Sequence, residues 1–112
     1  MAQYLIQVAY TPQAWSSLLK NPQDRTQVLK PVLEKLGGSF GSAFMAFGEY
    51  DIVGILDMPS NVEAAAFAMA ASAGGAIKSI KTTPLMTLEE GIEAMKKAGQ
   101  SGYVPPGAPA GV

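Results

Sequence analysis

Cysteine and histidine are both absent from this sequence of 112 residues. Without cysteine the chain has no disulfide, no thiolate nucleophile and no zinc–cysteine site. Without histidine it lacks the commonest metal ligand, the usual acid–base group at neutral pH and the usual haem ligand. We therefore expect neither a metal site nor a cofactor.

Excess charge and long apolar runs are also missing. Eight basic and nine acidic residues give a net charge of -1. A basic stripe, which marks most nucleic-acid-binding proteins, is not present, so we expect no nucleic-acid partner. The longest apolar run, residues 64–71, is far shorter than the roughly 20 residues of a membrane span, and residues 1–4 lack the pattern of an export signal. These features predict a cytoplasmic protein with no membrane partner.

The composition suits one small globular domain. Hydrophobic residues make up 48% of the chain, which is ample for a packed core. The length leaves room for one domain and not for two. We place that domain at residues 1–98 and interpret residues 99–112 as a C-terminal tail rich in proline, glycine and alanine.

The order of predicted elements indicates an α+β fold. Strands are expected at residues 4–10, 39–47, 51–58 and 76–83. Helices are expected after Thr11-Pro12, from Asn21-Pro22 to Leu36, and after two capping boxes that begin at Ser60 and Thr87. This is the βαββαβ order of a ferredoxin-like fold, with an antiparallel four-stranded sheet and an extra C-terminal helix.

The predicted strands are apolar on both faces. Phe40 and Phe44 are expected on one side of the second strand, with Met45 and Phe47 on the other. An antiparallel sheet with one wet face normally alternates apolar and polar residues. Strand propensity alone is one explanation. The explanation we favour is a homo-oligomer in which a second copy covers the open face, as when two sheets pair as a dimeric α+β barrel.

The helix predicted at residues 62–73 has no charge after Glu63 until Lys78. A helix that is apolar all round is normally buried all round, by the C-terminal helix and tail or by another subunit. Alternatively, alanine is small and a strong helix former, so an alanine-rich helix is tolerated at a surface. The sequence leaves both possibilities open.

A hairpin motif links the chain to a known family. Gly48-Glu49-Tyr50-Asp51, between an aromatic and an aliphatic strand, resembles the signature of the GYD domain family. The resemblance extends from Tyr4 through Leu36-Gly37-Gly38 to about Met95. It implies a dimeric α+β barrel and no particular activity. The hairpin is also similar to one in the ligand-sensing domain of leucine-responsive regulators, which lies near subunit contacts and effector sites.

The hairpin residues have two interpretations. In the structural one, Gly48 permits a turn, nearby carboxylates accept hydrogen bonds from turn amides, and a tyrosine packs beside the hairpin. In the functional one, the hairpin lies at the mouth of a cavity between helices and sheet, with aromatic residues lining that cavity. The candidate ligand-binding residues are then Tyr10, Trp15, Glu49, Tyr50 and Asp51. No catalytic residue is predicted.

Three functions are compatible with these features. The first, which we favour, is a small-molecule binding or sensing module that works as a homo-oligomer. The second is a cofactor-independent enzyme resembling the antibiotic-biosynthesis monooxygenases, which use the same barrel. The third is an assembly or partner-binding protein that uses the apolar helix at residues 62–73 and the C-terminal tail. One fold hosts many activities, so fold likeness alone does not decide among them.

Overall fold

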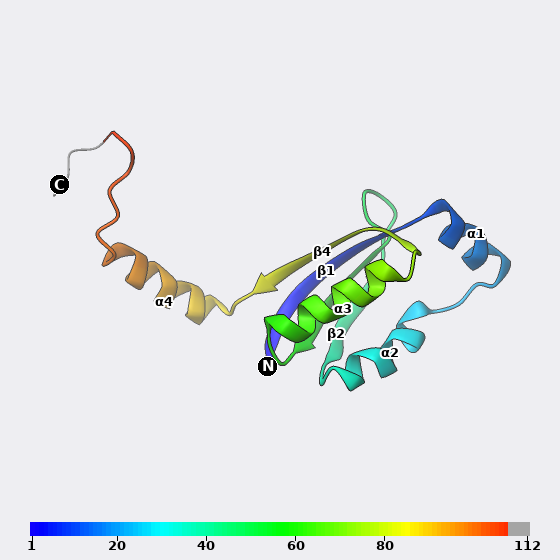
Figure 1. The fold of residues 1–112 in the computed structure, drawn as a ribbon. Helices are drawn as coiled ribbons and strands as arrows, with labels where there is room; N and C mark the ends of the chain where they lie inside the picture. The colour runs from blue at the N-terminus through cyan, green and yellow to red at the C-terminus, as the bar shows by residue number, and fades with distance from the viewer. Residues whose placement is uncertain (108–112) are drawn as a thin grey trace.

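Eight elements follow one another along the chain (Figure 1). The structure, a computed structural model, describes residues 1–107. The last part of the predicted tail, residues 108–112, lies outside the described residues. The elements are β1 (Ala2–Tyr10), α1 (Pro12–Lys20), α2 (Arg25–Lys35), β2 (Ser39–Met45), β3 (Ile52–Met58), α3 (Asn61–Ala73), β4 (Ile77–Leu85) and α4 (Leu88–Gly99).

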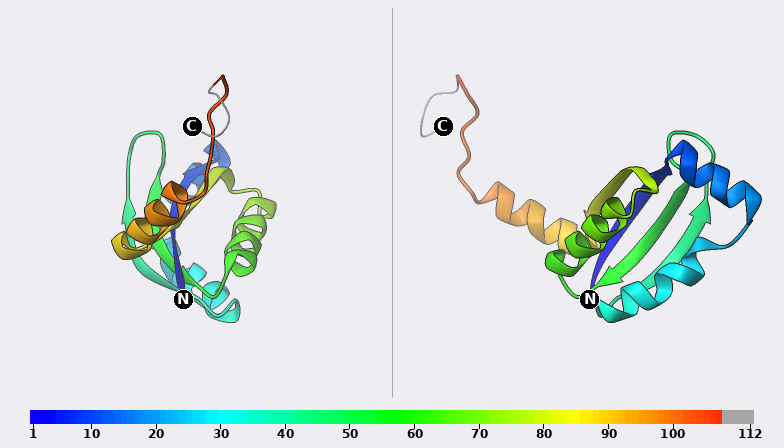
Figure 2. Two further views of the ribbon diagram at one scale, coloured as in Figure 1. Left: turned by 90° about the vertical axis from the view of Figure 1, so that its left-hand side faces the viewer. Right: turned by 45° about the vertical axis from the view of Figure 1, so that its right-hand side comes forward.

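The four strands form one antiparallel sheet in the order β2-β3-β1-β4. Helices α2 and α3 cover the same face of this sheet and leave the other face open (Figure 2). The predicted α+β, ferredoxin-like arrangement with an extra C-terminal helix is therefore confirmed. We call the side covered by α2 and α3 the helix face and the other side the open face.

Polar caps begin the helices, as the sequence predicts. At α4 the predicted capping box is complete, because the Glu90 amide donates to Thr87 at 3.1 Å and the Thr87 amide donates to Glu90 at 2.9 Å. The expected start of the second helix at Asn21-Pro22 is wrong. Asp24 caps α2 instead, because its carboxylate accepts from the amide of Thr26 at 2.9 Å and also from the hydroxyl of that residue.

A β-bulge in β2 changes which aromatic residues face the helices. The register shifts between Phe40 and Ser42, so Phe40 lies opposite Leu56 on the helix face while Phe44 lies opposite Val53 on the open face. The expectation that both phenylalanines share one side is therefore wrong.

The strand ends also differ from the prediction. β2 stops at Met45, so residues 46–51 form a longer connection than expected. Strand β4 continues through Pro84 to Leu85. Pro84 is tolerated there because β4 is an edge strand, where a missing N–H breaks no ladder bond.

The tightest packing lies where α2 ends and α3 begins. Leu33, Leu56 and Met58 are at most 1% exposed. At the end of α2, Gly37 takes a φ of 80°, the left-handed conformation that favours glycine. A Cβ on Gly38 would clash with the Sδ atom of Met58 and would lie 2.6 Å from the backbone carbonyl oxygen of Asp57, so this close approach requires glycine. We call this region the packed end.

Helix α3 is covered on one side within the single chain. Ala64 and Phe67 are each 3% exposed, whereas Val62 and Met69 are at least 70% exposed. Within the single chain α3 is therefore buried on one side only, and its cover by another subunit stays a prediction.

Helix α4 projects beyond the sheet as an arm (Figure 1). The radius of gyration is 18.6 Å, against about 13 Å for a compact domain of this length. The apolar residues Leu88, Ile92 and Met95 of α4 are 88%, 52% and 73% exposed.

In the described part of the chain, no helix combines the length and apolar character needed to cross a membrane.

Candidate functional site

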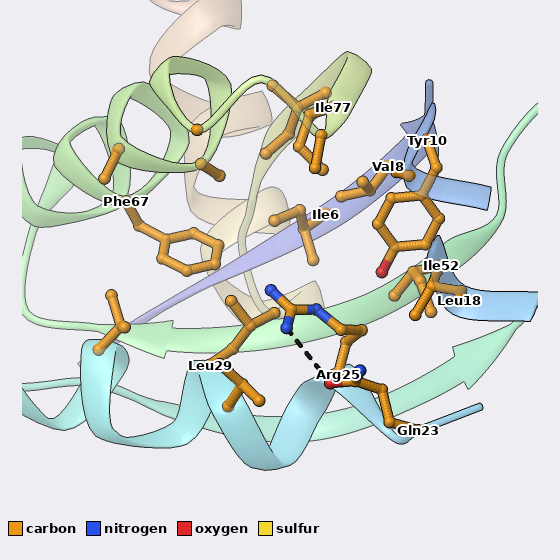
Figure 3. Close-up of a pocket in the computed structure, with 18 of the residues that line it drawn as sticks. Ile6, Val8, Tyr10, Leu18, Gln23, Arg25, Leu29, Ile52, Phe67 and Ile77 are labelled. Carbon is orange, nitrogen blue, oxygen red and sulfur yellow. Dashed lines mark hydrogen bonds between the residues drawn. The ribbon is translucent and has the colours of Figure 1, made fainter. Parts of the chain in front are cut away.

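A cavity of about 460 Å³ opens on the helix face at the end away from the packed core (Figure 3). It lies over the central strands β1 and β3, between α2, which packs mainly over β2, and α3, which packs mainly over β4. Side chains from the sheet and from all three neighbouring helices line it. They include Ile6, Val8, Tyr10, Leu18, Gln23, Arg25, Leu29, Ile52, Phe67 and Ile77. We call this region the hollow end.

Small residues form the wall that α3 contributes. Ala70, Ala71 and Gly74 line the cavity, and Ala76 continues the wall into β4. Larger side chains at these positions would fill the space between the helix and the sheet. The alanine-rich sequence of α3 is therefore what keeps this side of the cavity open.

Two aromatic residues predicted to bind ligand meet at the end of β1. The rings of Tyr10 and Trp15 pack edge to face, with centroids 5.5 Å apart and an angle of 85° between planes. Tyr10 lines the cavity. Trp15 lies on α1 and supports the Tyr10 ring without being among the residues that line the cavity.

Asp51 fixes the base of the hairpin to β1. Its carboxylate accepts a hydrogen bond from the amide of Tyr10 at 2.9 Å, and its own amide donates to the carbonyl of Val8 at 2.7 Å. The carbonyl of Asp51 accepts from the amide of Ala46 at 2.8 Å, which closes the hairpin loop. Asp51 thus positions a cavity residue, although its carboxylate bonds a strand amide and not the turn amides we expected.

The other two hairpin candidates lie outside the cavity lining. Glu49 is exposed, Tyr50 is half-buried, and neither is among the residues that line the space. The structure therefore brings Tyr10, Trp15 and Asp51 together and leaves Glu49 and Tyr50 apart from them. A ligand-binding role for these five residues stays a prediction.

Three polar residues in the lining were not among the candidates: Ser17, Gln23 and Arg25. The incorrect start of the second helix hid Arg25, because a helix from Asn21 gives that residue no special place. A sequence signal did exist. Asp24 is as good an N-cap as Asn21, and that choice places Arg25 at the first helical position.

Burial and nearby charges act on the Tyr10 hydroxyl. Burial raises its pKa above the ordinary value of 10.0, the positive charge of Arg25 lowers it, and the negative charges of Asp51 and Asp24 raise it. The net pKa is raised, so the hydroxyl is protonated at neutral pH and available as a hydrogen-bond donor.

The lining suits a molecule with an apolar body and a polar end. Aliphatic and aromatic side chains dominate, and the polar groups come from α1, the start of α2 and the end of β1. Across residues 1–107 no three acidic side chains come close enough together to hold a metal ion. The arrangement favours binding through apolar contact with a few directing polar groups.

Comparison with known proteins places the chain in a family. Neither the curated proteins nor the solved structures yielded a match. The family model described as the GYD domain matches residues 4–95, from within β1 through β2 to β4 and α1 to α3 into α4. The chain therefore belongs to the GYD domain family.

Proposed function

We propose that this protein binds a small organic molecule in the cavity at the hollow end and that it does so as a homo-oligomer. The observation that carries the proposal is the cavity itself. Its volume of about 460 Å³ lies in the range of small-molecule sites, and its lining is apolar with a few polar groups at one end. Binding is favoured over catalysis because the carboxylate of Asp51 is already engaged by the amide of Tyr10.

The test fills the cavity from the α3 wall. Decanol serves as a neutral apolar probe, and its binding is followed by NMR through the resonances of Phe67 and Ile77. Ala71→Leu is expected to abolish binding because its side chain occupies the cavity. The matched control is Ala73→Leu, on an exposed position of the same helix outside the lining, which should bind like the unaltered protein. Equal binding by both variants would place the probe elsewhere and contradict the proposal.

A second copy of the chain is the proposed cover for the open face. Leu5, Val53, Ile55 and Phe44 lie on that face, and Phe44 is 69% exposed. Polar side chains such as Gln7 lie beside them on the same face, and an apolar patch with polar neighbours is typical of an association site. Two copies related by a twofold axis would bury it sheet against sheet. Sedimentation of a dilute sample as a well-folded single subunit would contradict this part of the proposal.

Assembly through the α4 arm is a second candidate function, supported by its own observation. Leu88, Ile92 and Met95 are spaced at i, i+4 and i+7, so they form one apolar stripe, and all three are exposed. A helix of 12 residues is only marginally stable alone in water. Leu85, on the open face of β4, leads directly into the arm. The apolar surface of the sheet thus continues onto α4, which favours a second copy as the occupant of both.

A pair of substitutions on α4 tests this candidate. Ile92→Asp places a charge in the apolar stripe and is expected to reduce the subunit number seen by sedimentation. Ala94→Asp adds the same single negative charge at an exposed position of α4 outside the stripe and should leave the subunit number unchanged. A shared response in both variants would show that net charge, and not the stripe, controls association.

A further inference from the structure

Arg25 alone carries a charge among the described residues that line the cavity. It occupies the first position of α2, after the Asp24 cap, and is half-buried. Its guanidinium points among Ile6, Leu29 and Phe67 (Figure 3). A cation is thus directed into an otherwise apolar space.

Arg25 makes few polar contacts within the protein. Its Nη1 donates to Oε1 of Gln23 across a long 3.4 Å. Among the described residues, the one ion pair joins Lys97 and Glu93 on the distant arm. Arg25 therefore forms no ion pair with a carboxylate of these residues. A guanidinium carries five N–H donors in a planar fork, so most of its capacity is available to a ligand.

The apolar walls strengthen the preference for an anion at this point. Charges attract more strongly beside low-dielectric surfaces than in open water, and an unpaired cation next to apolar groups is costly. A ligand anion that pairs with Arg25 removes that cost. The hydroxyl of Tyr10 lines the same cavity, close enough to Arg25 for the two to interact electrostatically, and is a second donor for the same anion.

We propose that the occupant of the cavity is an amphipathic monocarboxylate, with its apolar body against Phe67 and Ile6 and its carboxylate on Arg25. This inference rests on the proposed small-molecule function. A single negative charge is favoured, because one cation faces the cavity and the nearby carboxylates of Asp24 and Asp51 oppose a second negative charge. The planar guanidinium fork matches a carboxylate with two parallel hydrogen bonds.

The test compares four probes that share one alkyl chain and differ in their head group: decanoate, decanol, decylamine and decyl phosphate. Affinities are measured by calorimetry below the concentration at which each probe forms micelles. Decanoate is expected to bind most tightly and decylamine least. Arg25→Met keeps an unbranched side chain, although a shorter one, and removes the charge. It is expected to weaken decanoate binding about tenfold or more, as for hydrogen bonds to a charged group. Decanol binding should stay unchanged in this variant.

The control and the opposing outcomes separate the two proposals. Lys30→Met removes the same charge from an exposed position of α2 and should leave decanoate affinity unchanged. Equal affinity for decanoate and decanol, insensitive to Arg25→Met, would overturn the monocarboxylate while the cavity function stands. Tighter binding of decyl phosphate would replace the monocarboxylate by a dianion. Failure of every probe, decanol included, would overturn the cavity function together with this inference.

Discussion

The packed end and the hollow end lie on the same face of the same sheet but differ in how the helices sit. At the packed end, Leu33 and Met58 are fully buried. At the hollow end, Tyr10, Ile52 and Ile77 are half-buried around the cavity, although they are just as apolar in sequence. Apolar character therefore does not by itself decide whether a region becomes core or cavity.

The chain connections account for the difference. At the packed end both helices join the sheet through very short links, residues 36–38 after α2 and 59–60 before α3. These links hold the helices close to the strands. At the hollow end α3 also joins β4 through a short link, residues 74–76, but β1 is separated from α2 by the whole of α1 and residues 21–24. The inserted helix allows the start of α2 to stand away from the sheet, and the cavity occupies the space.

The largest expected effect comes from truncating one leucine at each end. Leu33→Ala should lower the free energy of unfolding by about 2–5 kcal/mol, because it opens a void in a fully buried site. Leu18→Ala should cost less than about 1.5 kcal/mol, because Leu18 is half-buried beside an existing cavity. Urea unfolding of both variants measures the contrast. Equal losses would mean that the two ends are packed alike.

A smaller effect is expected from adding volume to α3. Ala64→Leu inserts a larger side chain where Ala64 is 3% exposed and should cost about 1–3 kcal/mol of unfolding free energy through overpacking. The same change at Ala71 enters the cavity and should be neutral or stabilise by about 0.5–2 kcal/mol. Thermal unfolding of the pair gives the difference. A destabilised Ala71→Leu protein would show that the cavity closes in solution.

The smallest effect is a dependence of the hollow end on pH. Hydrogen bonds from the side chain and amide of Thr26 lower the pKa of Asp24 below the ordinary 3.8. A carboxylate with a lowered pKa in the folded state stabilises that state above its unfolded pKa, and this contribution is lost as the pH falls through the folded value. The protection of amides near Thr26 against exchange, relative to their intrinsic rates, should therefore fall below about pH 4, before the protection near Leu33 falls.

Asp24→Asn provides the control for this titration. Asparagine is an equally good N-cap but does not ionise, so the variant should lose the acid-induced change near Thr26 while keeping α2 at neutral pH. An unchanged acid response in the variant would assign the loosening to other carboxylates.

Local signals in the sequence predicted the elements well and their edges less well. The Thr87–Glu90 capping box marked the start of α4 correctly, because both partners lie within one helical turn. Asn21-Pro22 and Asp24 offered competing starts for α2. In the structure Asn21 is the C-cap of α1 and Asp24 begins α2. The bulge after Phe40 was not predicted. When a strand is apolar on both faces, a shift of one residue does not change its apolar pattern, so the pattern does not reveal the bulge.

In the candidate site, too, a local feature was predicted and a feature that depends on helix placement was missed. Tyr10 and Trp15 were predicted to line a cavity because they are large aromatics at the end of a strand and the start of a helix, and the structure places their rings in contact. Arg25 was missed, because its orientation depends on where α2 begins and on how far that helix stands from the sheet. The start of α2 had a local signal in Asp24, but the distance of that helix from the sheet is not encoded within a few residues of Arg25.

By itself, the sequence determined the order of strands and helices, the α+β fold and the GYD family, because periodicity, caps and a contiguous hairpin motif are properties of short segments. The tertiary structure alone decided that one end of the helix face closes and the other stays hollow. That outcome depends on the distance between each helix and the sheet. This distance is set by connections of unequal length and by packing between segments that are far apart in the sequence.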